Sequence, residues 1–149
     1  MPPADTTELK KILRGAGFEI YRTTAQLVHL AERVRDNLIM DSGVAAQLTG
    51  TAEMQVFSVQ VNLRAQASHF PGAAEDQVWN HARSLAQGFF DSGYIEDGSR
   101  AEPMIDPSDP SQSLDTSYEI LLTRTVPDLD ALHEELRAAL NRRRSTSDD

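Results

Sequence analysis

The stretch EMQVFSVQVNLRAQ, residues 53–66, decides the fold class of this chain. From residue 59 onward apolar and polar side chains alternate, with Val59, Val61, Leu63 and Ala65 on one face and Gln60, Asn62, Arg64 and Gln66 on the other. This period of two predicts a β-strand, and its two unlike faces are typical of an antiparallel sheet covered on one side. Gly50, between this strand and a short predicted strand at 44–48, indicates a hairpin turn.

Helical periodicity dominates the segments on either side of this strand. It predicts helices over 6–14, 24–40, 73–92 and 127–144. In the second of these, Leu27, Ala31, Val34 and Leu38 follow one another at steps of four, three and four residues. A hairpin over 18–30 is the competing interpretation. We disfavour it because Thr23-Thr24 lacks the glycine or asparagine that tight hairpin turns prefer.

The remaining segments complete a fold of the α+β class. Residues 18–22 and 117–125 alternate and predict two further strands. Residues 97–116 contain three prolines and no periodicity, which predicts a long loop. We therefore expect a small, mainly antiparallel sheet with four helices packed on it. A single domain is expected over 1–144, followed by a disordered tail at 145–149.

Composition narrows the class of partner. The chain has 149 residues, no cysteine and a formal net charge of −9 at pH 7. An acidic surface repels phosphate groups, so we expect no nucleic acid and no anionic membrane as partner. The N-terminal segment lacks the apolar run of a secretory signal. Abundant alanine and a preference for arginine over lysine favour a bacterial origin, and we expect a cytoplasmic location.

The sequence contains no recognisable catalytic or metal site. A phosphate-binding loop and a nucleophile elbow of the Gly-x-Ser-x-Gly type are both absent. His133-Glu134 begins like a zinc-protease helix, but Arg137 stands where the second histidine would be needed. We therefore expect no catalytic residue of a known motif, no metal and no cofactor.

Two predicted helices carry unusually wide apolar faces. Trp79 and Phe90 extend the apolar stripe of helix 73–92, and Val28 and Ile39 flank the stripe of helix 24–40. A face wider than one sheet can cover needs another helix of the domain or a second chain. We therefore predict a non-enzymatic protein-binding module, an adaptor, chaperone-like or regulatory subunit, that forms a homodimer involving Trp79 and Phe90. Val28 and Ile39 are predicted as further partner-binding residues.

A second hypothesis is a small enzyme or ligand-binding domain. The predicted loop at 97–116 is long enough to act as a lid over a pocket between sheet and helices. His81, at the edge of an apolar helix face, or His69, just before that helix, would be the polar group of the pocket. A concave pocket beside these histidines would distinguish this hypothesis from the first.

Overall fold

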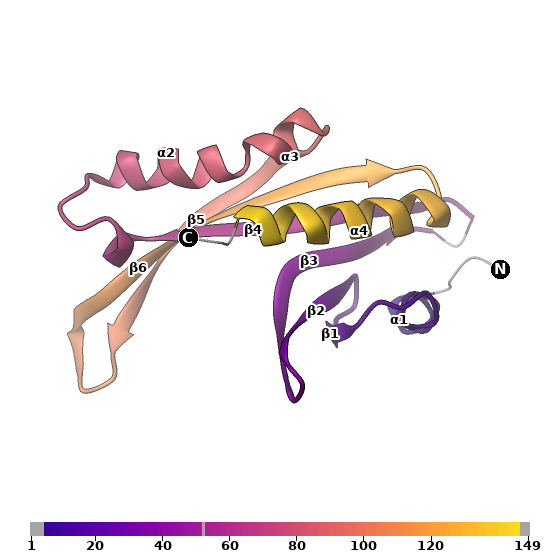
Figure 1. Ribbon diagram of the computed structural model, residues 1–149, viewed down its shortest axis with the longest axis horizontal. Helices are drawn as coiled ribbons and strands as arrows, with labels where there is room; N and C mark the ends of the chain where they lie inside the picture. The colour runs from indigo at the N-terminus through magenta and orange to yellow at the C-terminus, as the bar shows by residue number, and fades with distance from the viewer. Residues whose placement is uncertain (1–4, 52, 147–149) are drawn as a thin grey trace. The chain divides into compact units, whose positions relative to one another are not determined.

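A computed structural model describes residues 5–51 and 53–146, with the side chains of 110–114 and 145–146 outside the description. The strands form one antiparallel sheet of six, in the order β1-β2-β3-β4-β6-β5 (Figure 1). In chain order the elements are α1 (Thr6–Gly15), β1 (Ile20–Thr23), β2 (Leu27–Arg35), β3 (Leu38–Gly50), β4 (Gln55–Gln66), the 3-10 turn η1 (Ala67–His69), α2 (Glu75–Leu85), α3 (Gln87–Asp91), β5 (Ile95–Asp106), β6 (Asp109–Val126) and α4 (Leu129–Thr146). The α+β class expected from the sequence is confirmed.

Strand β4 forms where the alternating pattern predicts it. Val59 and Val61 are fully buried, and Leu63 and Ala65 are nearly so. β4 pairs with β3 in an antiparallel register that runs from Val44 opposite Val61 to Gly50 opposite Gln55. The hairpin predicted at Gly50 is therefore confirmed.

The helix predicted over 24–40 is wrong, because this segment forms β2 and the beginning of β3. Thr24 explains why the turn before β2 needs no glycine. Its hydroxyl accepts a hydrogen bond from the Leu27 amide at 3.2 Å, while its own amide donates to the Leu27 carbonyl at 2.8 Å. A threonine side chain thus closes the turn that tight hairpins otherwise close with glycine or asparagine, and the disfavoured hairpin is the one observed.

The long loop predicted over 97–116 is also wrong, because β5 and β6 fill it and form a hairpin that turns at residues 107–108. β5 is the last strand of the sheet, and an edge strand tolerates a proline such as Pro103. Pro107 lies in the turn itself. The Asp106 carboxylate accepts hydrogen bonds from the Ser108 amide and hydroxyl at 2.9 and 2.8 Å, which stabilises that turn.

The other predicted helices are present with changed boundaries. α1 covers the first, and α4 covers the last. The helix predicted over 73–92 is interrupted at Ala86, where α2 ends and α3 begins. The predicted disordered tail at 145–149 overlaps the end of α4, and its residues 147–149 lie outside the described residues.

The chain divides into two compact units, Met1–Val61 with Thr123–Asp149, and Asn62–Leu122. We call them unit 1 and unit 2. Unit 1 has a core that includes Leu9, Leu13, Val28, Leu30, Leu132 and Leu136, all fully buried. Unit 2 has a core around Phe89, Ile120 and Leu122, also fully buried. The prediction of a single domain over 1–144 stays a prediction.

Replacing Gly50 with alanine should destabilise the β3–β4 hairpin. Gly50 has φ +90°, and a Cβ there would collide with the Met54 carbonyl oxygen. We expect Gly50→Ala to lower the free energy of unfolding by about 1–3 kcal/mol, measured by urea denaturation. Gly15→Ala is the control, because a Cβ there meets no atom within 4 Å. Equal stability of the two variants would contradict the argument.

Candidate protein-interaction site

The end of the β2–β3 hairpin in unit 1 is a two-stranded arm, residues 32–41. β1 pairs with β2 as far as Leu30, and the Ala31 amide still donates to the Glu19 carbonyl at 2.9 Å. On the other side β4 pairs with β3 as far as Val44. Within the arm, and counting only the described strands, β2 and β3 pair with each other alone, from Glu32 opposite Met40 to Arg35 opposite Leu38 (Figure 1).

The arm carries large apolar side chains that face water. The exposed fractions are 50% for Val34, 44% for Leu38, 39% for Ile39 and 53% for Met40. A hairpin of two strands is at best marginally stable in water without a further strand or helix against it. Contiguous exposed apolar residues mark interaction sites in soluble proteins. The arm is therefore the strongest candidate for a protein contact in unit 1.

The base of the arm is held by polar contacts. The Ser42 hydroxyl is buried and donates to the Leu30 carbonyl at 2.8 Å. The Arg33 guanidinium contacts the Glu19 carboxylate at 2.9 Å and donates to the Asp36 carbonyl at 2.6 Å. The Arg33–Glu19 contact ties the arm to the segment before β1, whereas the Arg33–Asp36 bond lies within the arm.

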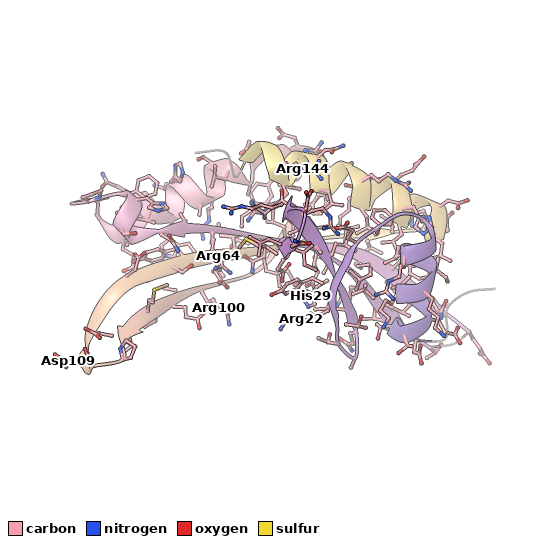
Figure 2. The ribbon with its side chains drawn as sticks, turned by 60° about the horizontal axis from the view of Figure 1, so that its bottom comes forward. Arg22, His29, Arg64, Arg100, Asp109 and Arg144 are labelled. Carbon is pink, nitrogen blue, oxygen red and sulfur yellow. The ribbon has the colours of Figure 1, made fainter. Side chains whose placement is uncertain are left out.

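His29 lies beside this base and is mostly covered. Its imidazole Nδ1 is 3.9 Å from an Asp41 carboxylate oxygen, and its side chain is 16% exposed. Burial lowers the pKa of His29 below its ordinary value of 6.5, Asp41 opposes that effect, and the Arg22 charge adds to it (Figure 2). The His29 side chain therefore lies mostly covered within the β2–β3 hairpin.

Mild acid should destabilise unit 1 through His29. The unfolded chain binds this proton near pH 6.5 and the folded chain only at lower pH, so stability falls as the pH drops from about 7 toward the folded pKa. We expect the wild-type melting temperature to fall more over this range than that of His29→Gln. His69→Gln, which changes an exposed histidine, should behave as wild type. An identical acid response of His29→Gln and wild type would refute this assignment.

Unit 2 contains a charge ladder across three strands. The Glu119 carboxylate of β6 is 7% exposed, and each of its oxygens has its own arginine partner. Arg64 of β4 contacts Oε1 at 3.0 Å, and Nε of Arg100 of β5 donates to Oε2 at 2.9 Å. Figure 2 labels the two arginines. Arg100 also lies 3.4 Å from the Glu102 carboxylate. The ladder connects the edge strand β5 to the strands inside the sheet.

A shallow depression of about 360 Å³ adjoins this ladder. It is lined by Asn62, Gly98, Ser99, Arg100, Glu119 and Leu121. Its charged groups pair with one another, and neither His81 nor His69 lines it.

The predicted ligand-binding histidines have other surroundings. His81 is half-buried on α2, with its ring centroid 4.6 Å from that of Phe70. His69 is exposed at the end of η1. The neighbouring Ser68 donates to both Asp115 carboxylate oxygens, at 2.9 and 2.7 Å, and the pKa of Asp115 is lowered chiefly by the hydroxyl bond. Since residues 97–116 form strands and a turn, the lid on which this hypothesis rests is absent from the described chain.

The four residues predicted to bind a partner differ in how far their side chains are exposed. Trp79 is half-buried on α2, stacked edge-on against Tyr118 at 5.0 Å and covered by the Arg83 guanidinium at 5.4 Å. Phe90 is half-buried on α3. Val28 is fully buried in β2, so it belongs to the core and not to a surface. Ile39 alone lies on the arm.

Asp36-Asn37 is the one signal in the sequence that could have revealed the arm. These two residues join two apolar segments, and aspartate and asparagine are turn-forming residues. Helical spacing between Leu27 and Leu38 concealed this turn, because the same spacing arises when two strands of a hairpin each contribute apolar residues.

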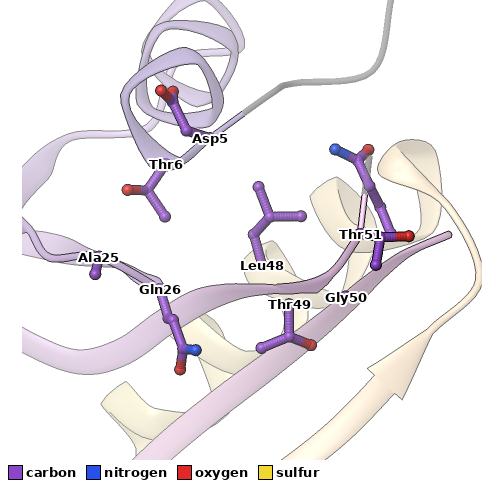
Figure 3. Close-up of a pocket in the computed structure, with 9 residues that line it drawn as sticks. Asp5, Thr6, Ala25, Gln26, Leu48, Thr49, Gly50 and Thr51 are labelled. Carbon is purple, nitrogen blue, oxygen red and sulfur yellow. The ribbon is translucent and has the colours of Figure 1, made fainter. Parts of the chain in front are cut away.

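A second depression, of about 270 Å³, lies in unit 1 (Figure 3). It is lined by Asp5, Thr6, Ala25, Gln26, Leu48, Thr49, Gly50, Thr51 and Gln55. The Thr6 hydroxyl already donates to the Thr24 carbonyl at 2.7 Å. Among the described residues of this lining, Asp5 supplies the single carboxylate.

Comparison with known proteins brings no relative: no family model, curated protein or solved structure matches this chain. Among the described residues, no three histidine, aspartate or glutamate side chains are grouped so that they could hold a metal ion. No helix in the described part of the chain is both long and apolar enough to cross a bilayer.

Proposed function

We propose that this chain is a non-enzymatic protein-binding module of the bacterial cytoplasm, an adaptor or regulatory subunit, that self-associates through the arm at residues 32–41. The observation that carries the proposal is the exposure of Val34, Leu38, Ile39 and Met40 on a hairpin that pairs with no third strand of the described chain. The proposal includes the predicted packing of helices on the sheet, which the burial of Leu132 and Leu136 on α4 and the contact of α4 with β3 support.

Burial of these side chains would stabilise an assembly. Full burial of one large aliphatic side chain is worth about 1.5–3 kcal/mol, and the arm side chains already lie about half covered. Four of them on each copy therefore supply several kcal/mol before the entropy cost of association. A strand of the second copy would also form hydrogen bonds with the backbone groups at the edges of β2 and β3 in the arm.

Charge favours a second copy as the occupant of the arm. The whole chain has a net charge of −9, so most of its surface repels another copy. Residues 32–41 contain three carboxylates and two arginines, for a net charge of −1. Two copies related by a two-fold axis would meet there with little repulsion, and the same patch would serve both.

The proposal differs from the sequence-based expectation in the residues that form the contact. Ile39 stays in the proposed interface, as part of the arm. Trp79 and Phe90 lie in unit 2, and Tyr118 and Arg83 cover part of Trp79. We expect Trp79→Ala and Phe90→Ala to lower stability and to leave the assembly intact.

The double variant Ile39→Lys/Met40→Lys tests the arm. Two ammonium groups in an apolar contact should convert a dimer into a monomer, with a dissociation constant raised about a hundredfold or more, which corresponds to about 3 kcal/mol. Sedimentation equilibrium over micromolar to millimolar concentrations measures the change. Ile95→Lys is the matched control, because Ile95 is a 63% exposed isoleucine of unit 2.

Two results would overturn the proposal. One is a wild-type chain that sediments as a monomer at every concentration. The other is a dimer that Ile95→Lys dissociates and Ile39→Lys/Met40→Lys does not. Circular dichroism of each variant establishes that the fold is kept, since all three positions are exposed and the substitutions leave the core unchanged.

A further inference from the structure

The outer edge of β5 is a strand edge that pairs with no other described strand. β5 is the last strand in the sheet order, and every residue from Ile95 to Ile105 is exposed. An edge strand of this length presents a row of backbone N–H and C=O groups that another extended chain can pair with. Unit 2 contains this strand entirely, so the edge and the arm of unit 1 have no residue in common.

The strands at this edge are acidic. β5 and β6, residues 95–126, contain seven carboxylates and two arginines, for a net charge of −5, and Arg64 and Arg83 pair with two of these carboxylates. Apolar side chains stand among these charges, with exposed fractions of 63% for Ile95, 52% for Met104 and 45% for Ile105. The edge therefore matches an extended segment in which basic side chains alternate with apolar ones.

Pro103 indicates which backbone groups are open. Proline has no N–H, and within a sheet it is tolerated where its nitrogen faces away from the neighbouring strand. Alternation along the strand then directs the N–H of Ala101, two residues earlier, to the same open side. The proline-free part of the edge is Ile95–Glu102.

The charge ladder holds this edge in place. Arg100 of β5 and Arg64 of β4 both contact the Glu119 carboxylate of β6, so β5 is tied to two other strands. Arg83 of α2 contacts Glu96 near the beginning of β5 at 3.3 Å. A strand that is already fixed costs less ordering entropy when a partner binds.

We propose that β5 is a docking edge for an extended, basic segment of another protein, which adds to the sheet as a seventh strand beside Ile95–Glu102. A second copy of this chain is disfavoured here, because two β5–β6 hairpins, each of net charge −5 over residues 95–126, would lie side by side. The inference extends the proposed protein-binding function to a partner class, and it uses a surface different from the arm.

A labelled peptide of alternating lysine and valine tests this docking edge on the full chain. We expect binding in fluorescence anisotropy that weakens as salt is raised, and no binding of the matching glutamate–valine peptide. Methylating alternate backbone nitrogens of the lysine–valine peptide should abolish binding, because the peptide can then no longer donate to the edge. Ala101→Pro should weaken binding about tenfold, equal to about 1.4 kcal/mol, whereas Ala101→Val should bind as wild type.

The results separate this proposal from the self-association through the arm. Ile39→Lys/Met40→Lys should bind the peptide as well as wild type does, whatever its oligomeric state. Absence of lysine–valine binding, equal binding of the methylated peptide, or equal binding by Ala101→Pro would each overturn the docking edge. Dissociation of a wild-type dimer by the peptide would also overturn it, because the edge would then be occupied by a second copy.

Discussion

The pairing of β3 with β4 is the constraint on which the other features depend. Its register, from Val44 opposite Val61 to Gly50 opposite Gln55, directs Val44, Val59 and Val61 into the core. A slip by one residue would turn every one of these side chains to the other face. β4 continues to Gln66, but its pairing with β3 ends at Val44 opposite Val61, next to Gly43, which has φ +81°. β3 residues before Val44 therefore pair with β2 alone, and the arm begins where the pairing with β4 ends.

Much of the fold was predictable from local patterns. β4 follows from strict alternation, α1 and α4 follow from helical spacing, and the turn at Gly50 follows from a glycine that must adopt a positive φ. The errors have one cause in common: tertiary context decided between two locally acceptable structures. Leu27, Ala31, Val34 and Leu38 fit a helix face, yet Thr24 and Asp36-Asn37 supply two turns that make the segment a hairpin. Pro103 and Pro107 suggested a loop, because a sequence does not reveal that one strand will lie at an edge and that its proline will face outward.

The candidate surfaces were harder to predict from the sequence than the fold was. Ile39 was identified as a contact residue for its place on a helix that does not exist, and it lies on the arm. Val28, selected by the same reasoning, is in the core. Side chains alternate between the two faces of a strand, and Val28 lies with Leu30 on the buried face of β2. The Arg64–Glu119–Arg100 ladder joins residues separated by 19 to 55 positions, and such a contact between strands has no signature in a single sequence.

That ladder makes the three positions unequal in their tolerance to change. Each oxygen of the Glu119 side chain belongs to a different guanidinium, so loss of Arg64 or of Arg100 alone leaves the carboxylate neutralised by the other. Loss of Glu119 would remove the one carboxylate that Arg64 and Arg100 share, and Arg100 would keep only its contact with Glu102. We therefore expect single substitutions of Arg64 or of Arg100 to be tolerated more readily during evolution than substitutions of Glu119.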